Sequence, residues 1–186
     1  CTVSANQITV NKNIISFDNN ENKSSKVIIK NNFPHKAYID TELYEVLNPN
    51  TKEETRILYK YIDEDTEYGQ SIMRKVNSLG YTVKDPSETK LIYSPDRHIL
   101  EESESILSEK LMSIINLNEN LDHEKVYRLK VFPLINGFKK NNEVNGVKIL
   151  LQYEILIMIQ PNNPVFSYLL FLSYHHNSCQ SLQILH

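Results

Sequence analysis

The sequence VKILLQYEILIMI, residues Val147–Ile159, has an apolar or aromatic residue at every second position along its whole length. Its even-numbered positions are mainly polar up to Glu154 and apolar after it. Its odd-numbered positions are all apolar or aromatic: Val147, Ile149, Leu151, Tyr153, Ile155, Ile157 and Ile159. A period of two predicts a β-strand with one continuous apolar face. Such a strand can be an ordinary core strand, or one whose apolar side chains are offered to another protein.

The sequence before this strand predicts further short strands separated by turns rich in Asn, Ser, Pro and Gly. These strands are expected at residues 7–17, 26–30, 37–47, 90–93, 97–100, 105–115 and 125–134. Several short strands with turn punctuation and no internal repeat favour an all-β protein, an antiparallel β-sandwich of about seven strands over residues 7–161.

Residues 48–88 interrupt this pattern because they are densely charged and carry helical spacing. The i, i+3, i+4 spacing is found in two groups, Ile57, Leu58, Tyr61 and Ile62, and then Ile72, Met73 and Val76. Gly80 is suited to the end of a helix. We therefore expect a charged, partly helical insertion at about 48–88 that protrudes from the sandwich.

Composition excludes several classes of function. The net charge is -3, which provides no basic field for nucleic acid. Cys1 and Cys179 are the only cysteines, too few for a disulfide framework or a zinc site of their own. His175 and His176 are adjacent to each other and, as strand neighbours, would point to opposite faces, which disfavours a metal site with Cys179. No nucleophile, metalloprotease or phosphate-loop motif occurs, so we predict a non-enzymatic protein without catalytic residues, metal, cofactor or small-molecule substrate.

The last part of the chain differs sharply from the body. Glu154 is its last charged residue, so residues 155–186 contain no Asp, Glu, Lys or Arg. One interpretation is that 162–186 is the remnant of a missing second domain, produced by truncation or a change of reading frame. The other is that Val165–Tyr174 forms a genuine strand that packs on the domain. Deletion after Pro161 distinguishes them, since only a genuine strand would contribute much stability.

Several short motifs occur along the chain in a recognisable order. Near the beginning are Ile8, Val10, Phe17 and Val27–Asn31. They are followed by Ser94–Glu101, by Glu124–Arg128 with Pro133 after it, and by the strand 147–159 with Gln160 and Pro161 at its end. Together they resemble the N-terminal domain of PapD-like periplasmic pilus-assembly chaperones. The resemblance covers roughly residues 7–161, and 48–88 matches poorly.

The resemblance implies a function as well as an immunoglobulin-like fold. Such chaperones have two immunoglobulin-like domains, bind pilus (fimbrial) subunits that lack one strand, and donate a strand of their own before assembly at an outer-membrane usher. The matching strand here is 147–159, which makes Val147, Ile149, Leu151 and Tyr153 the expected donor side chains. The implied location is the periplasm, with an export signal already removed before Cys1.

One feature of that family has no direct counterpart in this sequence. Its members anchor the terminal carboxylate of the subunit with an Arg in the first strand and a Lys in the last. Counting from Phe17 and Pro161 places these positions on Ile14 and Leu156, which cannot pair with a carboxylate. Four cationic residues are open as substitutes: Lys12, Arg128, Lys130 and Lys148.

A different class of protein is the main alternative, an immunoglobulin-like structural or adhesion subunit of a surface fibre. A subunit donates an N-terminal extension and lacks its last strand. In this chain the strongest strand, 147–159, lies near the C-terminal end. Its position therefore favours the chaperone.

Overall fold

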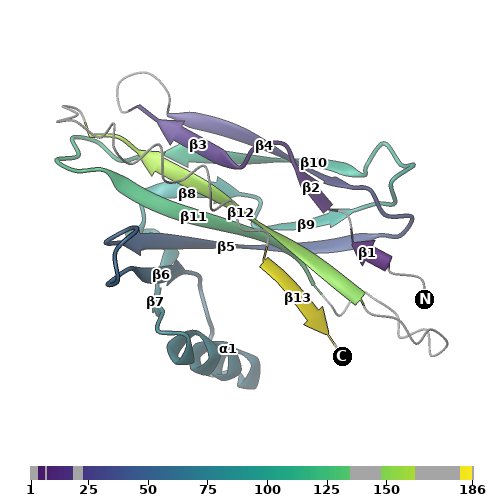
Figure 1. Ribbon diagram of the computed structural model, residues 1–186, viewed down its shortest axis with the longest axis horizontal. Helices are drawn as coiled ribbons and strands as arrows, with labels where there is room; N and C mark the ends of the chain where they lie inside the picture. The colour runs from purple at the N-terminus through teal and green to yellow at the C-terminus, as the bar shows by residue number, and fades with distance from the viewer. Residues whose placement is uncertain (1–3, 7, 19–22, 135–147, 162–180, 186) are drawn as a thin grey trace.

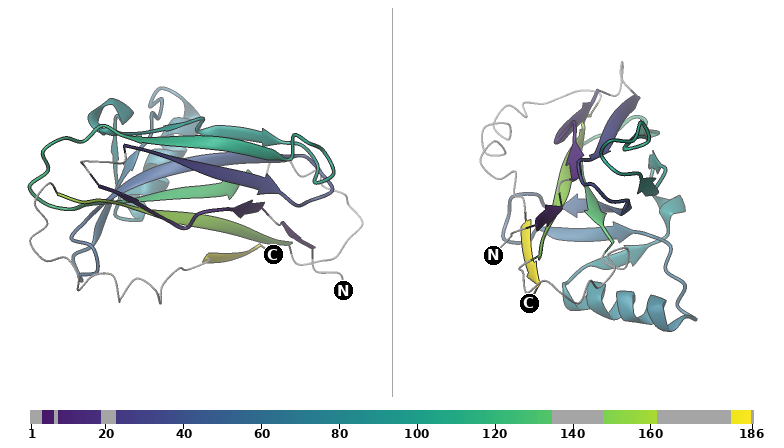
Figure 2. Two further views of the ribbon diagram at one scale, coloured as in Figure 1. Left: turned by 90° about the horizontal axis from the view of Figure 1, so that it is seen from above. Right: turned by 90° about the vertical axis from the view of Figure 1, so that its right-hand side faces the viewer.

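The computed structural model describes residues 4–6, 8–18, 23–134, 148–161 and 181–185. Two β-sheets lie face to face, as Figures 1 and 2 show. The larger sheet has nine strands: β1 (Ser4–Asn6), β3 (Ile14–Phe17), β5 (Ala37–Leu47), β6 (Thr55–Tyr59), β7 (Thr82–Lys84), β9 (Arg97–Leu100), β11 (Lys125–Pro133), β12 (Lys148–Ile159) and β13 (Ser181–Leu185). The smaller sheet has four: β2 (Ile8–Val10), β4 (Ser24–Asn31), β8 (Leu91–Ser94) and β10 (Glu109–Asn116).

The core lies between the two sheets. Alternate residues of β4 and β10 are buried while their neighbours face outward, which is the period-two pattern of a sheet with one covered face. From the larger sheet, Leu43, Leu129 and Ile157 are fully buried in the same cluster. Each such side chain contributes roughly 1.5–3 kcal/mol by leaving water, so this cluster dominates the stability of the sandwich.

The first predicted strand, residues 7–17, is divided between the two sheets. Its first part is β2, which pairs antiparallel with β4, and its second part is β3, which pairs parallel with β12. β1 also pairs parallel with β12. The larger sheet is thus mixed rather than purely antiparallel, because a strand near the start of the chain runs in the same direction as β12 near its end.

The structure confirms an all-β sandwich with one helix, and it describes more strands than the predicted seven. The strand predicted at 37–47 is β5 with the same bounds, β11 ends one residue before its predicted range does, and β12 spans the described part of 147–159. The one helix in the described ranges, α1 (Glu67–Ser78), is not long and apolar enough to cross a membrane.

The charged segment extends the larger sheet instead of standing apart from it. β6 pairs antiparallel with β5, α1 follows, and β7 then pairs parallel with β6, which makes a β–α–β unit at the sheet edge (Figure 1). The interpretation of Ile57 and Leu58 as helical is wrong, because both lie in β6 and Leu58 is opposite Tyr44 of β5. A short 3-10 turn (Pro86–Glu88) leads on to β8.

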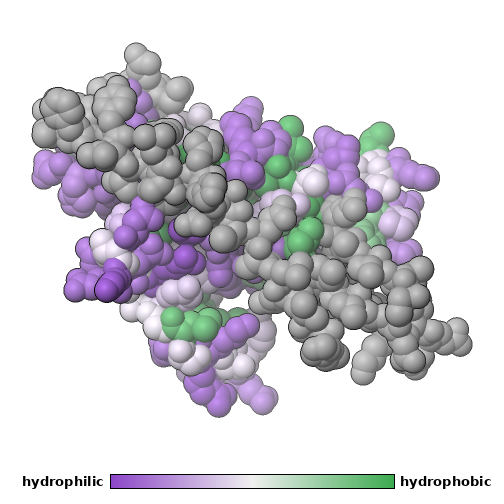
Figure 3. Space-filling view, viewed as in Figure 1, coloured by the Kyte–Doolittle hydropathy of each residue, from purple (hydrophilic) through white to green (hydrophobic). Residues whose placement is uncertain are grey.

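The ends of α1 have clear local causes. The hydroxyl of Thr66 accepts a hydrogen bond from the Gly69 amide at 3.0 Å, which caps the first turn. Gly80 has a φ of 75°, a left-handed conformation that glycine adopts without strain, and it follows the last turn as predicted. Val76 is buried against Leu58 and Tyr44, so the helix covers the outer face of this sheet extension. In this part of the molecule Figure 3 shows hydrophilic residues around a small apolar patch.

Candidate functional site

The predicted site lies on β12, and the two halves of this strand have different neighbours. Residues 153–159 pair antiparallel with β11, from Tyr153 opposite Val131 to Ile159 opposite Lys125. On the other edge, residues 156–159 pair parallel with β3. This C-terminal half is therefore an interior strand of the sandwich.

The odd-numbered residues of the C-terminal half face the core. Ile155, Ile157 and Ile159 are all 0% exposed and belong to the main core cluster. Because side chains of a strand alternate between faces, positions 149, 151 and 153 continue this row toward the start of the strand. The row of apolar residues at odd-numbered positions 147–159 therefore has two parts. Residues 155–159 fill the protein's own core, and residues 147–153 precede them along the same strand.

The N-terminal half, residues 148–152, leaves β11. Pairing between β11 and β12 stops at Tyr153, while β11 continues to Pro133 opposite Ile39 of β5. Beyond that point β12 pairs with short strands from the two ends of the chain. These are β1, parallel over 148–150, and β13, antiparallel over 148–152. In Figure 1, β13 lies on the side of β12 where β11 diverges.

The four predicted donor residues are placed as follows. Val147 lies outside the described residues. The backbone of Ile149 is in β12, opposite Ala5 and Ile184, and its side chain is not described. Leu151 is half-buried and lies opposite Leu182. Tyr153 is half-buried, packs against the core cluster, and has its pKa raised by burial, so it marks the boundary between the two halves.

The opposite face of β12 has its own small apolar cluster. Leu156 and Met158 are buried there together with Val46 of β5 and Val126 of β11. This cluster explains why the even-numbered positions of the sequence change from polar to apolar after Glu154. The C-terminal half of β12 is thus covered on both faces.

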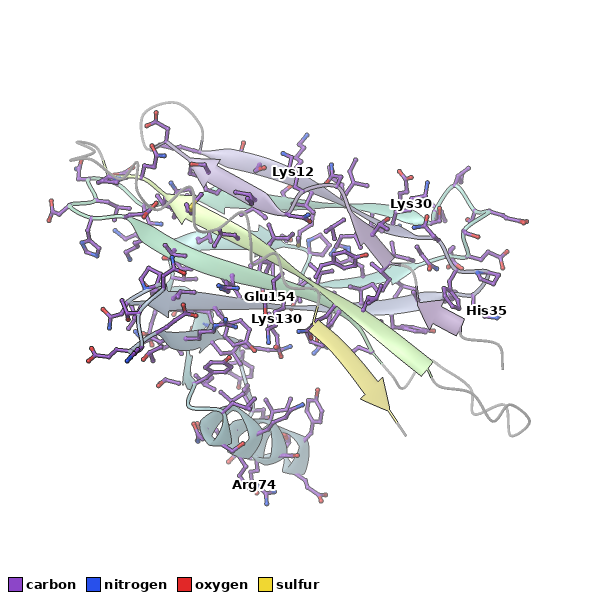
Figure 4. The ribbon with its side chains drawn as sticks, in the orientation of Figure 1. Lys12, Lys30, His35, Arg74, Lys130 and Glu154 are labelled. Carbon is purple, nitrogen blue, oxygen red and sulfur yellow. The ribbon has the colours of Figure 1, made fainter. Side chains whose placement is uncertain are left out.

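Glu154 lies at the transition and forms the centre of a charge network. Its carboxylate is 2.9 Å from Nη1 of Arg128, 3.6 Å from Nη1 of Arg56 and 4.0 Å from Nζ of Lys130. Lys130 also lies 4.9 Å from the ring centroid of Tyr44, a cation–π contact. Figure 4 shows Glu154 and Lys130 next to each other on the ribbon. All these side chains are mostly shielded from water, so their mutual attraction is only weakly screened.

The two positions predicted for the carboxylate anchor meet in the structure. Ile14 of β3 and Leu156 of β12 are register partners, and the Leu156 amide donates to the Asn13 carbonyl at 2.9 Å. The next residue in this row is Arg128, opposite Leu156 on β11. The predicted anchor position therefore holds two apolar residues, Ile14 on β3 and Leu156 on β12. The nearest cation across the sheet is Arg128 on the next strand, β11.

The four substitutes are not equivalent. Arg128 is held by Glu154, and its Nε is buried without a hydrogen-bond partner among the described residues. Lys130 lies beside the same carboxylate, whereas Lys12 is exposed and donates to the Ser25 hydroxyl at 3.0 Å. The side chain of Lys148 is not described. Of the four, Arg128 is thus the one adjacent to the predicted anchor position.

The histidines and acidic residues give no sign of metal chemistry within the part of the chain that is described. No group of three or more His, Cys, Asp or Glu side chains there is arranged to hold an ion. His98 is buried opposite Ile39, and burial lowers its pKa. The sequence His175, His176 and Cys179 lies outside the described residues.

Comparison with solved structures finds the same fold in fimbrial chaperones. A chain from a chaperone–tip adhesin complex of CFA/I fimbriae biogenesis has a TM-score of 0.57 at 16% identity, over 84% of this chain and 57% of that one. The class 5 fimbriae chaperone CfaA has a TM-score of 0.56 at 15% identity, with the same coverage. A chain from the CsuC–CsuE chaperone–tip adhesion subunit complex of Acinetobacter baumannii has 0.51 at 12%, over 94% and 62%. No family model and no curated protein matches the sequence.

These structures confirm the fold inferred from the sequence motifs: the chain has the immunoglobulin-like fold of fimbrial chaperones. It spans a little over half the length of those chains, 57% in the first two. At 12–16% identity the likeness concerns the fold.

Sequence reasoning missed the neighbours of the N-terminal half of β12. β1 has three residues, too few for a periodic pattern, and β13 lies in the segment interpreted as a remnant. The sequence SLQIL of β13 does alternate at Leu182 and Ile184, which is a signal that could have been found. The alternative strand considered for the tail, Val165–Tyr174, lies outside the described residues.

Proposed function

We propose that this chain is a pilus-assembly chaperone that binds fimbrial subunits in the periplasm and donates β12 to them. The observation that carries the proposal is the change of neighbours along β12. Its C-terminal half is fixed in the sandwich between β11 and β3, and its N-terminal half extends past β11 with the same apolar row. The likeness of the fold to fimbrial chaperones supports it.

The physical logic follows from what an incomplete subunit lacks. A sandwich without one strand exposes an apolar groove and two unpaired sheet edges, which makes it prone to aggregation. An added strand supplies main-chain hydrogen bonds to both edges and alternate side chains to the groove. In this proposal Val147, Ile149 and Leu151 enter the groove, and Tyr153 lies at the edge of the chaperone's own core. The stabilised subunit is then delivered to an outer-membrane usher.

The alternative of a fibre subunit is less consistent with the described sandwich. A subunit that awaits a donated strand lacks its last strand. Here β12 pairs with both β11 and β3, and Ile155, Ile157 and Ile159 complete the core. The described part of this domain therefore has its own last strand and extends it.

The test is capture of a fimbrial subunit from the same organism, refolded from denaturant with the subunit's own N-terminal extension removed. The wild-type chain is expected to give a soluble one-to-one complex by size exclusion with light scattering. The variant Ile149→Asp with Leu151→Asp is expected to lose capture and stay folded, because each carboxylate would be buried without a partner. The matched control is Leu150→Asp with Gln152→Asp, which places the same two carboxylates on the other face without removing a cation and should retain most capture.

Three results would count against the proposal. They are a wild-type chain that fails to capture the subunit, an Ile149→Asp, Leu151→Asp variant that still captures it, and unfolding of that same variant. The last would show that Ile149 and Leu151 belong to the core, as in an ordinary sandwich strand.

A further inference from the structure

The strand β13 occupies the part of β12 that the proposed function needs for its partner. Five consecutive pairs join them in antiparallel register, from Lys148 opposite Leu185 to Gln152 opposite Ser181. These five residues of β12 are the ones that β11 leaves, since its pairing stops at Tyr153. β13 therefore begins where β11 ends along the same strand.

The opposite edge of the same residues is also occupied. β1 pairs parallel with Lys148–Leu150, the three residues that β13 also contacts. A strand has two edges, so two partners at the same residues must lie on opposite sides of it. Strand addition needs an edge with free amide and carbonyl groups. In this arrangement residues 148–150 offer neither edge.

We propose that residues Ser181–Leu185 are an internal cap, which holds the edge of β12 in place of a subunit strand and must be released before a subunit binds there. The inference rests on the proposed function for the identity of the partner. The partner is a fimbrial subunit with two open sheet edges: one edge strand replaces β13 antiparallel along Lys148–Gln152, and the other replaces β1 along Lys148–Leu150.

The register shows why β13 imitates such a partner. Leu182 is opposite Leu151 and Ile184 is opposite Ile149. Residues directly opposite in an antiparallel pair share one face of the sheet. The apolar positions of β13 are therefore on the same face as the donor row, which is the set of proposed donor positions 147, 149, 151 and 153. A subunit strand that borders an apolar groove has the same alternation.

The pairing is also of a kind that can be released. Strand β13 is five residues long and in the described structure pairs with β12 alone, and short edge strands open locally at low cost in free energy. A closed cap reduces the apparent affinity for a subunit by the fraction of molecules that are open. Such a cap shields an aggregation-prone edge until a subunit arrives.

A reversible cross-link tests the cap. In a chain with Cys1→Ser and Cys179→Ser, the pair Leu150→Cys and Gln183→Cys places two thiols at opposite positions of β12 and β13. Directly opposite residues have Cα atoms about 4.5–5.5 Å apart, within the range of a disulfide. Both substitutions are on the face away from the donor row. The matched control, Leu150→Cys with Ser181→Cys, is two residues out of register and should cross-link poorly.

The readout is capture of the refolding subunit described above, with the cross-link formed and then reduced. Oxidation is expected to lower capture at least about tenfold, and reduction should restore it, because only the open form is competent. Deletion of residues 181–186 is expected to speed capture several-fold. Without any subunit, the same deletion should increase hydrogen exchange of the amides in 148–152.

The outcomes separate this inference from the proposed function. If the in-register pair does not cross-link, or if the oxidised form captures subunits as well as the reduced form, the cap is rejected while the chaperone role stands. If the chain with residues 181–186 deleted and the reduced chain both fail to capture any subunit, the proposed function fails, and with it the partner named here.

Discussion

The two halves of β12 have the same sequence pattern and different surroundings. Residues 155–159 are buried on both faces, in the sandwich core on one side and in a small apolar cluster with Val46 and Val126 on the other. Among the described strands, residues 148–152 pair with β1 and β13, short strands of three and five residues. An alternating apolar row is thus compatible with a core strand and with a docking strand in one continuous element.

The difference teaches that neighbours, not side-chain type, decide the role of each half. β11 continues along β5 after it leaves β12, so the large sheet diverges at Tyr153. Residues after Tyr153 pair with β11 and β3 of the sandwich, and residues before it pair with the short strands β1 and β13. Substitutions in the two halves should therefore act on different measurable quantities, stability in one and binding in the other.

The largest effect is expected from a charge in the buried half. Ile157→Asp should unfold the domain, because Ile157 is 0% exposed and a buried unpaired carboxylate adds to the loss of several apolar contacts. The truncation Ile157→Ala should cost about 2–5 kcal/mol in the free energy of unfolding. The measurement is a denaturant titration followed by circular dichroism. Leu151→Asp, in the other half and half-buried, is the matched control and should fold.

If Leu151→Asp were as destabilising as Ile157→Asp, the comparison between the two halves would be wrong. The whole of β12 would then be a core strand, and the proposed donor role would lose its structural basis.

The boundary between the halves can be tested at Glu154. Its carboxylate is shared by Arg128, Arg56 and Lys130, and its side chain is 17% exposed. Glu154→Gln removes the charge and leaves these cations close together, so we expect a loss of about 1–3 kcal/mol in the free energy of unfolding. The double variant with Arg128→Gln should recover part of that loss, since one repelling cation is then gone. Losses that simply add in the double variant would show that the two residues are not coupled.

Much of the sandwich could be predicted because its strands alternate over many residues. β5 has eleven residues, and its predicted bounds are correct although the strand is buried on both faces over much of its length. Ile57 and Leu58 were misassigned because a short apolar run satisfies helical spacing and strand spacing equally. The tertiary partner, Tyr44 of β5, decides between them, and no local pattern contains it.

The candidate site was predicted as a row of residues but not as two halves. The period of two correctly places Tyr153 on the face of Ile155 and Ile157. Where the row leaves the core depends on the length of β11 pairing, which is a long-range property. The pairing of β13 with Lys148–Gln152 could not be predicted either, because it is also a long-range contact. The five residues of β13 alone do not specify which strand they pair with.

A smaller effect is expected from removal of the β13 strand. Deletion of residues 181–186 should change the free energy of unfolding by about 1 kcal/mol or less, because β13 is a short strand that pairs along one edge of β12. Denaturant midpoints of the full chain and the shortened chain give the measurement. A drop comparable to that of Ile157→Ala would show that β13 is an integral strand of the sandwich, and a cap that opens readily would then be excluded.

The smallest effect concerns two tyrosines that mark the core and the boundary. Burial raises the pKa of Tyr127, which is 1% exposed, to about 12, and it also raises the pKa of the half-buried Tyr153. Since the folded state holds each phenol proton more tightly than the unfolded state does, this contribution to stability is present below pH 10. It is lost as the pH rises toward the folded pKa.

Replacement of each phenol by Phe should therefore flatten the alkaline limb of a plot of stability against pH, and more for Tyr127→Phe than for Tyr153→Phe. Unfolding free energies from pH 8 to pH 11 give the comparison, with the wild-type chain as reference because other buried tyrosines contribute equally to all three. The Tyr127 hydroxyl also interacts with Thr89 and Asn118, so its variant loses some stability at every pH. The informative quantity is the slope and not the level. A slope changed as much by Tyr153→Phe as by Tyr127→Phe would place Tyr153 inside the core. The boundary between the two halves of β12 would then lie closer to Gln152.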